Sequence, residues 1–175
     1  MQLGLRDKVA VVTGASRGIG RAVAQTLLEE GSAVAICSRN AAQLDAAVHE
    51  LSKKGRVLGV PTDVTDESAV KKFVATVHKE FGRVDILVNN AGTHLRGTVE
   101  STTLDVLERQ LRDKVFGFFA MIKAVLPIMK AQRATHRQYR GAGGASSAPR
   151  SLPVWRHQCR IDCTQQVGRR FCCAR

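Results

Sequence analysis

An apolar run that ends in a glycine-rich turn is the feature that most constrains the fold of this chain. Residues 9–20 read VAVVTGASRGIG, and an amphipathic stretch follows them. This order predicts a buried strand that turns sharply into a helix. Glycines at such a turn let backbone N–H groups and the positive end of the helix approach a phosphate. Turns use glycine for many reasons, but the strand before this one and the helix after it favour a nucleotide-binding site.

Strand-like and helix-like segments alternate up to about Lys130. After the strand 9–12 and the helix 18–30, the pattern predicts strands at 33–37, 56–61 and 84–88 and helices at 41–53, 66–81 and 103–130, with candidate kinks at Gly117 and Pro127. This alternation predicts the α/β class, with a Rossmann-type doubly wound parallel sheet. No apolar run beyond residue 130 can supply another strand. We therefore expect the sheet to be incomplete after the fourth strand and its helix, with that strand at an edge.

The charged residues divide the chain into two unlike parts. Of its 27 basic and 15 acidic side chains, 18 and 14 lie in residues 1–130, whereas residues 131–175 hold nine arginines and one acid. We expect residues 1–130 to form a nucleotide-binding domain and residues 131–175 to be an irregular, disordered basic tail. Arginines can bind nucleic-acid phosphates without sequence preference. A nucleic-acid-binding tail is therefore an alternative function, although no folded module or aromatic platform supports it.

The end of the second predicted strand bears on the choice of cofactor. In an open α/β sheet this point lies beside the adenosine ribose of a bound dinucleotide. An acid there selects NAD, whereas Ser38 and Arg39 offer a hydroxyl and a guanidinium, which suit the 2′-phosphate of NADP. Arg17, inside the glycine-rich turn, can add a second cation. The alternative is that both arginines are simply solvated.

The third and fourth predicted strands also end in residues that suit a nucleotide. Asp63 and Val64 end the third strand, where a short polar side chain can meet the edge of an adenine. The sequence Asn89-Asn90-Ala91-Gly92 ends the fourth strand with small residues, which allow the backbone to approach a cofactor closely.

Together, the motifs TGASRGIG, SRN, DV and NNAG resemble the short-chain dehydrogenase/reductase family over about residues 5–129. The resemblance implies oxidation of alcohols or reduction of carbonyls with NAD(P), in an enzyme that is usually a homo-oligomer. With Arg39 it favours NADP over NAD. The implied cofactor-binding residues are Gly14, Ser16, Arg17, Gly18, Ile19, Gly20, Ser38, Arg39, Asp63, Val64, Asn89, Ala91 and Gly92.

The catalytic residues that the resemblance calls for are not found. The family uses a tyrosine as proton donor, a lysine four residues later that lowers its pKa, and a serine that orients the carbonyl. The chain has a single tyrosine, Tyr139, and Gly143 stands four residues after it. Ser146 and Ser147 follow the tyrosine instead of preceding it. Lys114 occupies the helix position where the family usually has asparagine, and it is a weak catalytic candidate.

The tail suggests a shift of reading frame. It has no lysine, holds four of the five cysteines, and contains the only tryptophan and tyrosine. Out-of-frame reading of GC-rich DNA gives such a composition, and we interpret residues 131–175 in this way. Sequencing the locus around codons 128–135 tests the hypothesis. An open frame without a family-like continuation in either shifted frame would contradict it.

Other readings of single residues are less favoured. Cys159, Cys163, Cys172 and Cys173 with His157 lack the spacing of a structural zinc site, so no metal is expected. His94 can border a substrate cleft, but a solvated loop histidine is the preferred interpretation. The start of the chain has neither a basic region nor a long apolar run, and no apolar run reaches the ~20 residues that span a bilayer. A cytoplasmic protein without membrane contact is expected.

By resemblance, the sequence thus predicts an NADP-dependent oxidoreductase of a small carbonyl or alcohol substrate, catalytically impaired in this chain. A non-catalytic nucleotide-binding module is the alternative.

Overall fold

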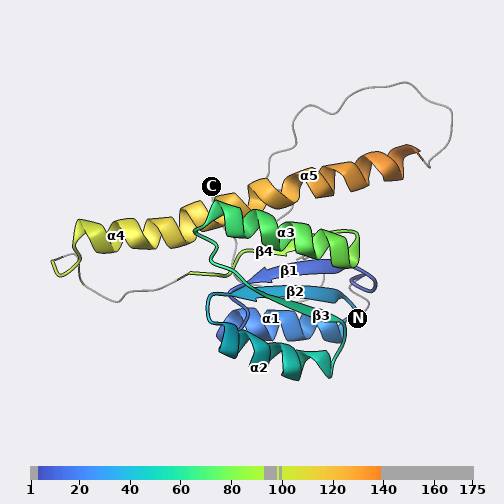
Figure 1. The fold of residues 1–175 in the computed structure, drawn as a ribbon, viewed down its shortest axis with the longest axis horizontal. Helices are drawn as coiled ribbons and strands as arrows, with labels where there is room; N and C mark the ends of the chain where they lie inside the picture. Colours follow the sequence, from blue (N-terminus) through green and yellow to red (C-terminus); the bar gives the residue numbers. More distant parts are fainter. Residues whose placement is uncertain (1–3, 93–97, 99, 139–175) are drawn as a thin grey trace, which may run out of the picture. The chain divides into compact units, whose positions relative to one another are not determined.

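Four strands alternate with helices in the computed structural model, which describes residues 4–92, 98 and 100–138 (Figure 1). The elements are β1 (Val9–Thr13), α1 (Gly18–Glu29), β2 (Ala33–Ser38), α2 (Ala41–Ser52), β3 (Val57–Pro61), α3 (Glu67–Phe81), β4 (Ile86–Val88), α4 (Leu104–Leu111), a π-helical turn (Arg112–Phe116) and α5 (Gly117–Gln138). The predicted order of strands and helices is confirmed. A π-helical turn ends just before Gly117 and Pro127 lies inside α5, and the kinks expected at these two residues stay predictions.

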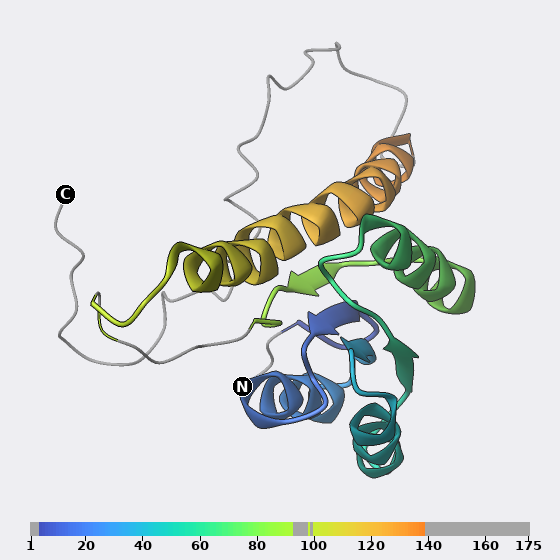
Figure 2. The same ribbon diagram turned by 60° about the vertical axis from the view of Figure 1, so that its left-hand side comes forward.

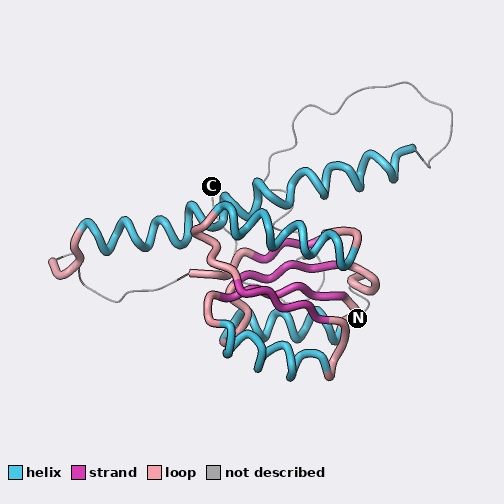
Figure 3. Tube along the Cα trace, in the orientation of Figure 1, coloured by secondary structure: helices cyan, strands magenta, loops and turns pink. Residues whose placement is uncertain are grey.

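The strands form a parallel sheet in the order β3-β2-β1-β4 (Figure 3). Val9 of β1 pairs with Ala33 of β2, and Ala10 pairs with Ile86 of β4. The chain therefore adds β2 and β3 on one side of β1, and then crosses to the other side of β1 to add β4. In open α/β sheets a ligand binds at this reversal, beyond the carboxyl ends of the strands. The α/β Rossmann-type class is confirmed.

Helices cover both faces of the sheet (Figure 2), and each face carries its own apolar core. Ala10 and Val12 of β1 pack with α1 and α2, whereas Val9 and Val11 pack with α3 and α5. Successive side chains of a strand point to opposite faces. The continuous apolar run VAVV therefore contributes to both cores, as expected for a parallel sheet covered on both sides.

Helix α5 extends to Gln138, so the expected end of this helix at Lys130 is wrong. The additional turns include Gln132, whose side-chain amide donates to the Val84 carbonyl at 2.9 Å and accepts from the Val84 N–H at 2.8 Å. A residue assigned to the tail thus holds α5 against the segment that leads into β4. The expected division into residues 1–130 and a disordered tail 131–175 stays a prediction, because residues 139–175 lie outside the described part.

Strand β4 lies at an edge of the described sheet, as the sequence predicts. Its start is fixed by Asp85, which accepts from the Val9 N–H at 2.9 Å and from Arg83 Nη2 at 2.6 Å. Partial burial tends to raise the pKa of Asp85, but the hydrogen bonds from Arg83 and Val9 outweigh it and leave the pKa below its ordinary value. This carboxylate therefore stabilises the start of the strand at neutral pH.

Helix α4 and the turn after it expose an apolar stripe. Leu104, Leu107 and Leu111 lie at helical spacing on one face, and each is more than two-fifths exposed. The exposure continues through Val115, Phe116 and Phe119. The whole stretch Leu104–Gln132 is long and apolar enough to cross a membrane by length and composition, a test that core helices of soluble proteins also pass. In this chain Met121 and Val125 of the same stretch are buried against α3 and the sheet.

We expect the double substitution Leu107→Gln and Leu111→Gln to reduce self-association of the protein. Exposed apolar patches drive association, whereas exposed side chains contribute only about 0.5 kcal/mol to folding. Light scattering against concentration measures the first effect and chemical denaturation the second. As a control, Met121→Gln and Val125→Gln replace buried side chains and should lower the unfolding midpoint instead. Unchanged light scattering for the first pair would contradict the prediction.

Candidate cofactor-binding site

The glycine-rich turn forms an open cradle at the carboxyl end of β1. Gly14 and Gly18 have left-handed φ angles of 65° and 58°, which a residue without Cβ adopts at little cost. The N–H groups of Gly14 and Ala15 donate to the Cys37 carbonyl at 2.8 and 3.3 Å, which ties the turn to the end of β2. At the start of α1, Arg17 makes no side-chain cap. The first N–H groups of the helix are therefore left for an anion.

Close packing under the turn explains two of its glycines. A Cβ on Gly14 would lie 2.8 Å from the Ala91 Cα, and a Cβ on Gly20 would collide with the Asn90 amide. By contrast, a Cβ on Gly18 would meet nothing within 4 Å. Gly14 and Gly20 are therefore required by the protein itself, whereas Gly18 faces open space where a ligand can lie.

Thr13 and Asn90 join the turn to the end of β4. Neither is among the cofactor-binding residues that the family resemblance implies, although both lie in its motifs. Thr13 Oγ1 accepts from the Asn90 and Ala91 N–H groups at 2.9 and 3.0 Å. Asn90 Nδ2 donates to the carbonyls of Thr13 and Gly14 at 2.9 and 3.1 Å. The available signal in the sequence was a threonine at the end of an otherwise apolar strand. In the structure its side chain is buried, at 1% exposure. Both side chains position backbone that a nucleotide would contact.

The structure brings together the residues that were expected to lie beside the adenosine ribose. Ser16 of the turn donates through Oγ to Ser38 Oγ at 3.0 Å, a contact between residues 22 positions apart. Arg39 follows and is exposed, so its guanidinium is accessible. Asn40 then caps α2 by accepting from the Gln43 N–H at 2.9 Å. The hydroxyls, an arginine and a helix start thus meet at one corner of the sheet.

The end of β3 is fixed by its own turn. Asp63 Oδ1 accepts from the N–H and the hydroxyl of Thr65, at 2.9 and 2.8 Å. Val64 is buried, and a Cβ on Gly117 would lie 2.9 Å from its Cγ2. Gly117 therefore allows α5 to approach the segment that was predicted to meet the adenine. Asp66, next in this turn, caps α3 by accepting from the Ser68 N–H at 2.8 Å.

Lys114 lies at the end of β4. Three carbons of its side chain, Cγ, Cε and Cδ, are the nearest atoms to a Cβ built on Gly92, at 3.2, 3.5 and 3.9 Å. The side chain is exposed and takes part in no ion pair among the described residues. Nearby, Asn89 Oδ1 is a buried acceptor for which the described residues offer no donor. Tyr139, His94 and the tail cysteines with His157 lie outside the described residues.

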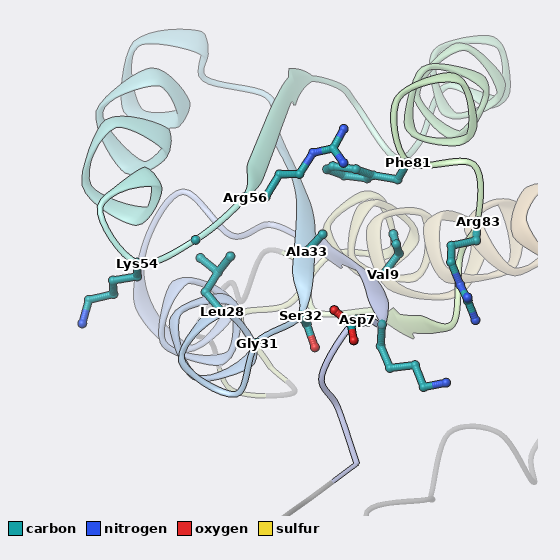
Figure 4. A pocket seen from close by; sticks show the side chains of 12 residues that line it. Asp7, Val9, Leu28, Gly31, Ser32, Ala33, Lys54, Arg56, Phe81 and Arg83 are labelled. Atoms are coloured by element: carbon teal, nitrogen blue, oxygen red, sulfur yellow. The ribbon is translucent and has the colours of Figure 1, made fainter.

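A separate hollow of about 420 Å³ opens at the opposite, amino-terminal ends of the strands (Figure 4). Its cations are largely neutralised, because Lys54, Arg56 and Arg83 pair with Glu29, Glu80 and Asp85. Arg56 also lies over the Phe81 ring, 4.7 Å from its centroid (Figure 4). These contacts join the loops at this end of the sheet to the ends of α1 and α3, away from the glycine-rich turn.

No group of three His, Cys, Asp or Glu side chains that could hold a metal ion occurs in the part of the chain that the structure describes. Cys37 is buried at the end of β2, and burial raises the pKa of its thiol to about 12. At neutral pH this thiol is therefore protonated and serves as a small core side chain.

Comparison with known proteins identifies the class to which this fold and site belong. Residues 8–136 match the model of the short chain dehydrogenase family. The chain belongs to this family of oxidoreductases, whose members bind a nicotinamide dinucleotide.

Three relatives illustrate the match. Oxidoreductase BOA17 of Botryotinia fuckeliana is 37% identical over 143 residues, which cover 81% of this chain and 52% of the relative. The structure of L-sorbose reductase from Gluconobacter frateurii, complexed with NADPH and L-sorbose, is 34% identical with a TM-score of 0.71 and covers 75% of this chain and 51% of that one. The Pseudomonas aeruginosa RhlG/NADP complex is 35% identical with a TM-score of 0.70, covering 74% and 51%. The chain thus spans about half the length of the relatives it matches.

Proposed function

We propose that residues 8–138 form the nucleotide-binding half of a short-chain dehydrogenase that prefers NADP, and that the chain as it stands is catalytically impaired. The cofactor preference is supported by the grouping of Ser16, Ser38 and Arg39 at the carboxyl end of β2. Two hydroxyls meet there at 3.0 Å beside an exposed guanidinium, at the position where an acid would select NAD. Two similar structures, L-sorbose reductase and RhlG, are complexes with NADPH and NADP, which agrees with this preference.

The proposed cofactor would cross the carboxyl edge of the sheet. Its adenosine end would lie at Ser38, Arg39 and Asp63, its pyrophosphate over the turn Gly14–Gly20, and its nicotinamide half toward Asn89–Gly92. The exposed side chain of Ile19, 78% accessible in the first turn of α1, would be partly covered by such a ligand. The cofactor supplies the hydride that the family's reaction transfers. The protein contributes charge, close backbone approach and orientation.

A non-catalytic nucleotide-binding module is the second candidate function. It is favoured by Lys114, which stands where the family usually has asparagine, and by the missing Tyr-x-x-x-Lys pair. A turnover assay with bound cofactor separates the two candidates. The cytoplasmic location, the absence of membrane contact and the oligomeric state stay predictions, and a nucleic-acid-binding role depends wholly on the tail.

Replacing Arg39 tests the cofactor preference. Arg39→Ala removes a charge-assisted contact worth roughly 1.5–3 kcal/mol, so NADPH should bind about tenfold or more weakly. NADH, which has no 2′-phosphate, should be little affected. Titration by fluorescence of the reduced nicotinamide measures both affinities.

Two further variants serve as controls for Arg39. Arg39→Lys keeps the charge without the forked geometry and should give an intermediate loss. Arg17→Ala tests the second cation: a contact of Arg17 with the 2′-phosphate would weaken NADPH binding alone, whereas a contact with the pyrophosphate would weaken NADPH and NADH binding equally. Equal affinities of the unmodified protein for NADPH and NADH would contradict the proposal.

A further inference from the structure

Two polar side chains near the end of β4 have no partner in the part of the chain that the structure describes. Within that part, Asn89 Oδ1 is a buried acceptor without a donor, and the Lys114 ammonium pairs with no acid. A buried acceptor without a donor is costly, and native structures keep few of them. The exposed ammonium of Lys114 can donate to ligand oxygens, and the adjacent hydroxyls of a ribose are such acceptors.

Local backbone geometry places the Lys114 side chain here. Lys114 is the central residue of the π-helical turn Arg112–Phe116 between α4 and α5. Turns of this kind interrupt regular helices and are frequent at functional sites. The stem of the lysine then lies against Gly92, where its Cγ is 3.2 Å from the position of a Cβ. Because Gly92 has no side chain, the lysine can lie across the strand end.

This strand end is continuous with the glycine-rich turn. The Ala91 Cα would lie 2.8 Å from a Cβ on Gly14, so the two backbone segments are in contact. The Gly14–Gly20 turn, Ala91, Gly92 and the Lys114 stem thus follow one another along the carboxyl edge of the sheet. Arg39 lies on the other side of β1, at the end of β2. A dinucleotide whose adenosine end is held at Arg39 would therefore bring its second ribose toward Lys114.

We infer that Lys114 is a cofactor-binding residue, whose ammonium donates to the hydroxyls of the second ribose of the dinucleotide. The inference rests on the proposed function and extends it to a residue that the family pattern does not supply. Lys114 would add affinity for the nicotinamide half that is independent of the 2′-phosphate contact at Arg39. It would act in binding, with no step of proton transfer assigned to it.

Three ligands of increasing length, each titrated into the full chain, isolate this contact. 2′-Phospho-ADP contains the adenosine end and the pyrophosphate, 2′-phospho-ADP-ribose adds the second ribose, and NADPH adds the ring. Isothermal titration of Lys114→Met should show about tenfold weaker binding of the last two ligands and unchanged binding of the first. Lys114→Arg keeps the charge and should restore most of the affinity. Lys130→Met removes an exposed lysine of α5 and is the matched control.

Each of the other outcomes overturns either the inference about Lys114 or the proposed function. Equal weakening of all three ligands by Lys114→Met, or the same effect from Lys130→Met, would show a general effect of charge and overturn the inference. A lower melting temperature of ligand-free Lys114→Met, without a selective loss of the ribose-containing ligands, would show that the ammonium serves the Asn89 acceptor inside the protein. If Arg39→Ala weakens all three ligands while Lys114→Met changes none, the proposed function stands and the inference fails. No binding of any ligand by the unmodified chain would overturn the proposed function itself.

Discussion

No NADP-linked reduction of ketones, quinones or acyl thioesters is expected from the chain as it stands. Hydride transfer leaves an alkoxide that must be protonated, and a donor positioned near neutral pH contributes about 10²–10⁴-fold. Tyr139 is the only phenol, and Gly143 replaces the lysine that would depress its pKa. Spectrophotometric assays with NADPH, at protein concentrations where binding is demonstrated by titration, would measure this.

The assay needs variants that identify any unexpected donor. Turnover that survives Tyr139→Phe but is lost in Lys114→Ala would contradict the prediction and assign proton donation to Lys114. Turnover lost in Tyr139→Phe would instead show that the tail is placed over the cofactor. His94→Ala completes the set, because His94 is the remaining candidate from the sequence. Each result therefore assigns a specific residue.

Gly14→Ala is expected to destabilise the protein and remove cofactor binding, whereas Gly18→Ala should cost much less stability. Both residues have left-handed φ angles, which cost an alanine roughly 1–2 kcal/mol. Only at Gly14 does the new methyl also collide with backbone, at 2.8 Å from the Ala91 Cα. Backbone cannot rotate away as a side chain can, so the turn must separate from the end of β4.

The matched pair of glycine variants separates packing from conformational strain. Chemical denaturation should place the unfolding free energy of Gly14→Ala about 1–3 kcal/mol below that of Gly18→Ala, an overpacking cost. Titration with NADPH should find no binding to Gly14→Ala. Equal stabilities of the two variants would contradict the role of Gly14 as the contact point between the turn and β4.

Local pattern was enough to predict the order of elements because each one depends on near neighbours. The run VAVV between polar residues predicts a buried strand, the spacing of Val70, Phe73 and Val77 predicts one face of α3, and Asp66 predicts its cap. The end of α5 was placed too early, although residues 131–138 read AQRATHRQ and are mostly good helix formers. The tertiary contact in this part, between the Gln132 amide and the Val84 backbone, has no local pattern in the sequence.

Tertiary structure also decided which faces are covered. Leu104, Leu107 and Leu111 have the spacing of a core-facing helix, yet all three are exposed, whereas Met121 and Val125 farther along the same stretch are buried. Periodicity defines an apolar face but not whether this chain supplies something to cover it. The three leucines lie beyond the reach of the sheet that the described residues build.

The sequence by itself determined the class of fold, the glycine-rich turn and the strand ends where a nucleotide would bind, because these follow from period, turn chemistry and the parallel order of strands. Only the tertiary structure decided how the ends meet: Ser16 bonded to Ser38, Thr13 and Asn90 joining the turn to β4, and Lys114 lying against Gly92. These partners are 22 to 77 positions apart. Their contacts depend on sheet register and helix packing, which bring distant backbone within hydrogen-bonding distance and have no local pattern in the chain.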